Sequence, residues 1–92
     1  MLELYQAEGC PHSAKVRETM TDLGLSAVVH NPRRPGNEGG DVLNEQVQSE
    51  MEAVAGDDQI PFLVDHQHGE TLLGSDDIVE YLEDRYEGSR RE

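Results

Sequence analysis

A segment of helix length lies between two short apolar runs near the start of the chain, and this alternation constrains the fold more than any other feature. From Pro11 to Leu23, apolar residues recur at the spacing of one helical face, and Gly24 is typical of a residue that ends a helix. The apolar runs at 2–6 and 26–31 predict strands on either side. Two strands joined by a helix form a right-handed crossover and pair in parallel, so this part of the chain predicts a βαβ unit.

The remaining pattern predicts a second helix, a hairpin of two strands and a third helix. A helical spacing runs from Asp41 to Ala55, and short apolar runs at 62–64 and 71–73 flank a turn at 66–69. Aspartates in the first turn of the last helix suit the positive end of its dipole. The predicted fold class is α/β with the order β-α-β-α-β-β-α, in which helices flank a mixed four-stranded sheet.

Length and charge limit the kinds of protein that this chain can be. Its 92 residues predict one domain at 1–87 and a flexible C-terminal tail at 88–92. Twenty acidic residues face seven basic ones, and a net charge of −13 repels nucleic acid and anionic membranes. An acidic excess with a single lysine resembles proteins from salt-loving cells. We read no signal peptide and no membrane-spanning segment, and we expect a cytoplasmic monomer.

Cys10, the only cysteine, stands where the first strand gives way to the first helix and opens the sequence Cys10-Pro11-His12-Ser13. A thiol at a helix start faces unpaired backbone N–H groups and the positive end of the dipole, which both favour the reactive thiolate. We therefore expect a pKa below the free value of about 8.5, opposed by Glu8 and aided by a protonated His12, and a sulfur that solvent can reach. Ser13 stands where a resolving cysteine would be, so the chain cannot close a disulfide with itself.

Three sequence motifs give the chain a resemblance to the glutaredoxins, a thioredoxin-fold family. They are Cys10-Pro11-His12-Ser13 after the first strand, Ile60-Pro61 before the third, and Gly74-Ser75-Asp76-Asp77 before the last helix. The N-terminal domain of glutathione transferases is also similar, above all from Leu73 to Leu82.

The resemblance implies roles for residues at each of these motifs. It makes Cys10 the nucleophile within the catalytic set Cys10, Pro11, His12 and Ser13. It implies that Pro61 is cis and that the backbone of Ile60 pairs with the cysteinyl part of a bound thiol. It also implies that Ser75 and Asp76 hold the γ-glutamyl end, whereas Asp77 is expected to be only a helix-start charge.

The glutaredoxin pattern usually has a lysine three residues before the cysteine, and this chain has Ala7 there. In the family that lysine contacts the glycine carboxylate of glutathione. Either Arg33 or Arg34 replaces it from the loop at 31–40, or the thiol lacks glycine, as γ-glutamylcysteine does. A solvated loop is the plainer expectation for both arginines, and Lys15 is expected either to face Cys10 or to pair with an acid.

On this resemblance the chain is an enzyme of redox homeostasis, a monothiol glutaredoxin-like oxidoreductase. It would reduce mixed disulfides between proteins and a small γ-glutamyl thiol, with glutathione or γ-glutamylcysteine as co-substrate. One alternative is a carrier of a [2Fe–2S] cluster held by Cys10 of two chains and two small thiols. The other is a thiol-binding module like the first domain of a transferase. His66 and His68 lie in the predicted turn, and we predict no metal site there.

Overall fold

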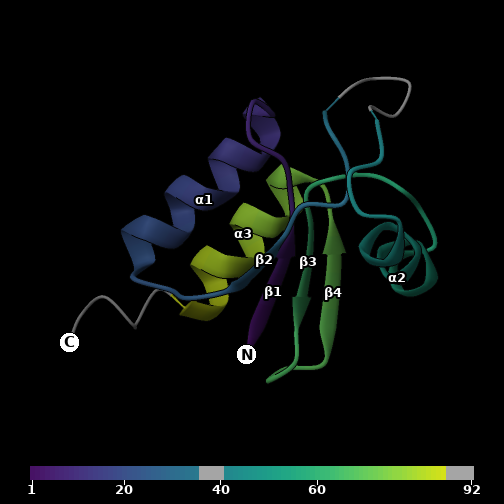
Figure 1. Ribbon diagram of the computed structural model, residues 1–92. Coiled ribbons are helices and arrows are strands. Elements are labelled where there is room, and N and C mark those ends of the chain that lie inside the picture. The colour runs from purple at the N-terminus through teal and green to yellow at the C-terminus, as the bar shows by residue number, and fades with distance from the viewer. Residues whose placement is uncertain (36–40, 87–92) are drawn as a thin grey trace.

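The computed structural model describes residues 1–35 and 41–86, and its elements follow the predicted order β-α-β-α-β-β-α (Figure 1). The strands are β1 (Leu2–Tyr5), β2 (Val28–His30), β3 (Phe62–Asp65) and β4 (Glu70–Leu73). The helices are α1 (Pro11–Leu23), α2 (Glu45–Ala55) and α3 (Ser75–Tyr86). The predicted tail at 88–92 lies outside the described residues.

The four strands form one mixed sheet in the order β2-β1-β3-β4. β1 pairs in parallel with β2 and antiparallel with β3, and β3 pairs antiparallel with β4. Tyr5 lies opposite both His30 and Phe62 in this register. The predicted parallel pairing of the first two strands, the predicted hairpin and the fold class are confirmed.

Two apolar clusters fill the two sides of the sheet. α1 and α3 lie together against one face, and α2 lies near the other (Figure 1). The cluster under α1 and α3 consists of Leu2, Leu4, Val16, Met20, Leu23, Leu63, Ile78 and Leu82. The cluster on the side of α2 consists of Tyr5, Ala7, Cys10, Met51, Ile60 and Phe62. Each of these side chains removes apolar surface from water, worth about 1.5–3 kcal/mol for a large aliphatic or aromatic residue.

The second strand is shorter than the predicted run at 26–31. Only Val28, Val29 and His30 pair with β1. The last hydrogen bond between the two segments comes from Gln6, which follows β1 and donates from its backbone N to His30 O at 2.9 Å. β2 is an edge strand, so Val28 and Val29 stay 45% and 48% exposed. An edge strand has a neighbouring strand on one side only, so its side chains receive less cover than those of a central strand.

The second helix begins at Glu45 and not at Asp41 as predicted. The backbone N–H groups of Leu43 and Asn44 both donate to Pro32 O, at 2.8 and 3.2 Å, which holds these residues in a loop. The Asn44 side chain then caps the helix by accepting from the backbone N of Val47 at 3.1 Å. Leu43, expected on the buried face, is therefore 54% exposed.

Helix lengths also bear on the membrane. α1, α2 and α3 have 13, 11 and 12 residues. Within residues 1–35 and 41–86, no helix has the length and the apolar run needed to cross a bilayer.

Candidate functional site

Cys10 is the N-cap residue of α1, the position that the sequence predicts for it. Its backbone is extended, and its Sγ accepts a hydrogen bond from the backbone N of Ser13 at 3.5 Å. Pro11 takes the first helical position, where its fixed φ fits and its missing N–H costs no hydrogen bond. The sulfur thus lies over the first turn of the helix and replaces the oxygen of an ordinary cap.

The sulfur is less accessible than the sequence suggested. Only 6% of Cys10 is exposed, because the residue belongs to the apolar cluster that also holds Ile60 and Phe62. Ser13 is 0% exposed, and its Oγ accepts from the backbone N of Ala7 at 3.3 Å, which fixes the turn between β1 and α1. The thiol is therefore held at the helix start, with a small opening to solvent.

The environment of Cys10 favours its ionised form. Burial raises the pKa of the thiol, but hydrogen bonds from Ser13 and from the His12 backbone, with the charge of Arg33, outweigh burial and lower the pKa below its ordinary value. The direction is the one expected, although one cause differs. Glu8, expected to oppose ionisation, instead forms an ion pair with Arg17, with Nη2 and Oε2 3.2 Å apart.

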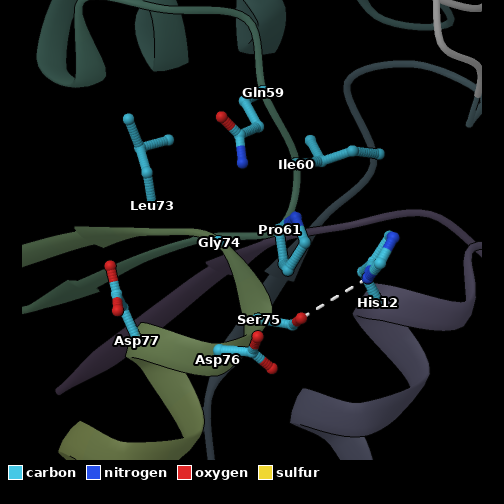
Figure 2. Close-up of a pocket in the computed structure, with 9 residues that line it drawn as sticks. All are labelled: His12, Gln59, Ile60, Pro61, Leu73, Gly74, Ser75, Asp76 and Asp77. Atoms are coloured by element: carbon cyan, nitrogen blue, oxygen red, sulfur yellow. Dashed lines mark hydrogen bonds between the residues drawn. The ribbon is translucent and has the colours of Figure 1, made fainter.

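A cavity of about 400 Å³ opens between the start of α1 and the start of α3 (Figure 2). The residues that line it are His12, Gln59, Ile60, Pro61, Leu73, Gly74, Ser75, Asp76 and Asp77. The Ile60–Pro61 peptide bond is cis, as the resemblance implies. The cavity brings together five of the predicted site residues from three distant parts of the chain, whereas Cys10 and Arg33 do not line it.

Two polar links join α1 to α3 across the mouth of this cavity. His12 on α1 points toward Ser75 on α3, with Nδ1 and Oγ 3.5 Å apart (Figure 2). Lys15 Nζ lies 2.7 Å from Asp76 Oδ1, and this hydrogen-bonded ion pair lowers the pKa of the Asp76 carboxyl. Ser75 is 7% exposed, whereas Asp76 projects into solvent. The cavity therefore has a hydroxyl and a carboxylate at the start of a helix, where backbone N–H groups favour an anion.

Arg33 is buried, contrary to the expectation of a solvated loop. It is 7% exposed, and its guanidinium donates from Nε to Asp58 O at 3.0 Å and from Nη1 to Arg34 O at 2.8 Å. No carboxylate of the described residues forms an ion pair with it. Arg33 lines a second cavity, of about 260 Å³, with Ala7, Glu8, Asn31, Arg34 and Leu43.

The two histidines of the hairpin turn have structural partners. His66 Nε2 contacts Glu3, and His68 Nδ1 lies 2.8 Å from Asp65 Oδ2. In the part of the chain that the structure describes, no three or more His, Cys, Asp or Glu side chains are grouped so that they could hold a metal ion.

From the sequence alone the role of Lys15 stays open, Gln59 belongs to no motif, and Gly74 stands only as the first residue of the motif before the last helix. Lys15 follows His12 by three residues and so shares its helix face, which was a usable signal. Gly74 has φ +89, and a Cβ there would lie 3.6 Å from Gln59 Nε2. A side chain at this position would be strained and would narrow the cavity between Gln59 and Ser75.

The sheet order, the helices on both sides of the sheet and the cis-proline beside the start of α1 define a thioredoxin-like domain. A family model for the N-terminal domain of glutathione S-transferases matches residues 4–90. The chain belongs to this family. No curated protein sequence matches the chain.

Solved structures with the same fold include transferases in complex with oxidised glutathione. Glutathione transferase URE2P6 from Phanerochaete chrysosporium, in complex with oxidised glutathione, is 28% identical, with a TM-score of 0.70 over 97% of this chain and 38% of its own. URE2P8 from the same fungus, with oxidised glutathione, is 25% identical, with a TM-score of 0.73 over 98% and 38%. Glutathione transferase E6 from Drosophila melanogaster, 24% identical over 94% of this chain and 35% of its own, shares the fold with a TM-score of 0.72.

These transferases are much longer than the present chain. It spans between 35% and 43% of the length of the first structures that it matches. The family therefore accounts for the architecture of the chain.

Proposed function

We propose that this domain binds the γ-glutamyl end of a glutathione-type thiol in the cavity between α1 and α3. The observation that carries the proposal is the position of Ser75 and Asp76, which line that cavity at the start of α3 in a transferase N-terminal domain. Backbone N–H groups at the helix start bind the α-carboxylate of the ligand. The Asp76 carboxylate accepts a charge-assisted hydrogen bond from its ammonium group.

Ile60 supplies the contact for the middle of the ligand. It lines the same cavity next to Pro61, and its backbone N and O have no hydrogen-bond partner among the described residues. An extended cysteinyl residue would pair with both groups in the manner of an added strand. This contact would bring the sulfur of the ligand toward Cys10, which shares the apolar cluster of Ile60.

Arg33 supports glutathione itself over a thiol without glycine. Arg33 is 7% exposed, and among the described residues its guanidinium has only carbonyl partners, so no carboxylate there supplies the counter-charge that a buried cation needs. It lines its cavity beside Ala7, the position where glutaredoxins carry a lysine. A glycine carboxylate placed there would supply the missing charge, and γ-glutamylcysteine would leave it unpaired.

Thiol–disulfide exchange at Cys10 is the second candidate function, and the cap position with its lowered pKa favours it. The thiolate attacks the sulfur of the small thiol in a mixed disulfide, the target thiolate leaves, and a disulfide forms on Cys10. A second small thiolate then attacks that disulfide, releases the oxidised small thiol and regenerates Cys10. With 6% exposure, Cys10 reacts only with a sulfur that the bound γ-glutamyl end delivers to it.

The [2Fe–2S] alternative does not fit this arrangement. A cluster shared by two chains needs a thiolate that projects from each surface, and Cys10 is the only cysteine and is buried.

Calorimetric titration of the full chain with S-methylglutathione, which binds without redox chemistry, tests the first candidate. We expect binding by the wild type and by Cys10→Ser, since the recognition groups are unchanged. Reduction of a peptide–glutathione mixed disulfide, followed by mass spectrometry, tests the second. We expect the Cys10→Ser variant to lose exchange completely, because the serine hydroxyl does not ionise near neutral pH.

Each outcome separates the two candidates. Binding with no exchange in the wild type would leave a thiol-binding module, as in the first domain of a transferase. Absence of binding would reject both. Tighter binding of S-methyl-γ-glutamylcysteine than of S-methylglutathione would contradict the role given to Arg33.

A further inference from the structure

Lys15 is placed to act on the cavity although it does not line it. It projects from α1 one turn after His12, and its Nζ lies 2.7 Å from Asp76 Oδ1 on α3. The two side chains are 55% and 87% exposed, so an ion pair between them contributes little to stability. Lys15 is also the only lysine of a chain with a net charge of −13. Stability therefore does not explain why this lysine lies at the opening of the cavity between α1 and α3.

The charges around the cavity give that reason. Asp76 and Asp77 line it, and among its lining residues only His12 is basic. Two carboxylates without a nearby cation would attract an amine but repel a ligand that carries a carboxylate beside its amine. Lys15 offsets one of them and adds a positive charge at the mouth.

The Asp76 carboxylate can serve Lys15 and a ligand at once. Lys15 holds Oδ1, and Oδ2 has no hydrogen-bond partner among the described residues. A ligand ammonium can approach Oδ2 while Lys15 keeps its contact. The repulsion between the two ammonium groups is then offset when the ligand carries an adjacent carboxylate.

We propose that Lys15 is a specificity-determining residue that makes the cavity select an amino-acid end, with both ammonium and carboxylate, over a plain amine. This inference rests on the proposed function and adds the chemical selection at its γ-glutamyl end. Lys15 acts through its contact with Asp76 and through the positive charge that it adds at the opening of the cavity.

Two probes that differ only in the α-carboxylate test this selection. The first is S-methylglutathione, and the second is S-methyl-(4-aminobutyryl)cysteinylglycine, which keeps the amine and lacks that carboxylate. Calorimetric titration of the full chain at low ionic strength gives the ratio of the two dissociation constants. We expect the wild type to prefer S-methylglutathione and Lys15→Met to lower this preference about two- to fivefold, the range of an exposed charge contact.

Two further variants make the result specific. Lys15→Arg keeps the charge, and we expect it to retain the preference. Arg85→Met makes the same change in net charge near the far end of α3, where Arg85 lies 5.4 Å from the Tyr81 ring centroid, and should leave the ratio unchanged.

The possible outcomes separate a failure of this inference from a failure of the proposed function. If the wild type does not bind S-methylglutathione, the proposed function fails and the inference fails with it. If it binds and Lys15→Met leaves the ratio unchanged, or strengthens binding of both probes equally, the inference alone is overturned. An equal loss of preference in Arg85→Met would also overturn it, because overall charge would then explain the effect.

Discussion

The two ends of the molecule each contain a prominent aspartate, and their surroundings are opposite. Asp65, at the end of β3, is 0% exposed, whereas the Asp76 side chain at the start of α3 is 87% exposed. Asp76 has one side-chain partner in the described structure, which is Lys15. Asp65 accepts hydrogen bonds from the backbone N of Gln67 and of His68, from the hydroxyls of Tyr81 and Tyr86, and contacts His68 Nδ1.

This difference shows how one residue type can serve two purposes in a small domain. Burial alone would raise the pKa of Asp65, but the hydrogen bonds from Tyr81, Tyr86 and His68 outweigh it and hold the pKa well below its usual range. Such a saturated carboxylate ties the β3–β4 turn to α3 and has no capacity left for a ligand. The open carboxylate of Asp76 adds little to stability and keeps an oxygen available.

The largest expected effect is on stability, from Asp65→Asn. The asparagine amide has one neutral acceptor oxygen where the carboxylate has two charged ones. Its NH₂ group would replace an oxygen that accepts hydrogen bonds in the wild type. We expect a loss of about 3 kcal/mol in the free energy of unfolding, the scale for breaking a buried charged network. Chemical denaturation followed by circular dichroism measures it.

Asp76→Asn is the matched control for this substitution. It removes the same charge at an exposed position, so we expect no measurable change in the free energy of unfolding. Equal losses in the two variants would mean that burial does not separate the two ends, and the comparison would be wrong.

Acid should reveal the same contrast. The folded-state pKa of Asp65 lies below the unfolded value of about 3.9, so the native state binds the proton less readily than the unfolded chain. The stability that it contributes is fully present above about pH 5 and is lost as the pH falls below that value. Denaturation series between pH 7 and pH 3 should therefore show a shallower decline for Asp65→Asn than for the wild type. Parallel declines would assign acid sensitivity to other carboxylates.

The sequence was sufficient for the order of elements because their signals are local. The periodicity of α1, the glycine after it and the break at the β3–β4 turn all lie within a few residues of what they specify. The start of α2 could not be predicted in this way. It depends on hydrogen bonds to Pro32, a residue that is adjacent only in the folded chain.

The candidate site was predictable to the same degree and for the same reason. The cap position of Cys10 follows from its neighbours, and the resemblance placed Ser75 and Asp76. The pair of Lys15 with Asp76 joins residues 61 positions apart, and no local pattern encodes it. The burial of Arg33 also depends on a distant carbonyl, that of Asp58, so a loop arginine was expected to be solvated.

Ligand binding should reverse the ranking of the two aspartates. We expect Asp76→Asn to weaken binding of S-methylglutathione about tenfold, because it replaces a charge-assisted hydrogen bond to the ligand ammonium with a neutral one. Asp77→Asn is the control, since Asp77 lines the same cavity but is expected to be only a helix-start charge; the change should stay below about twofold. Calorimetry on folded variants gives both values. A larger loss of affinity in Asp77→Asn would mean that Asp77, and not Asp76, contacts the ligand ammonium.

Removing one partner of each aspartate sharpens the contrast further. Tyr86→Phe deletes a hydroxyl whose pKa is raised to about 12, by burial and then by its hydrogen bond to Asp65 at 2.7 Å. Because that hydrogen bond is to a buried charge and the other partners of Asp65 remain, we expect a loss of about 1–2 kcal/mol in the free energy of unfolding. Lys15→Met deletes the partner of the exposed carboxylate, and the same measurement should show a loss of less than about 0.5 kcal/mol.

The losses of stability in the two variants should also respond differently to salt. At 1 M the Debye length is about 3 Å, so the small effect of Lys15→Met should vanish while the effect of Tyr86→Phe persists. A Tyr86 effect that vanished in salt as well would mean that the Asp65 end is open to solvent ions, and the contrast between the two ends would no longer hold.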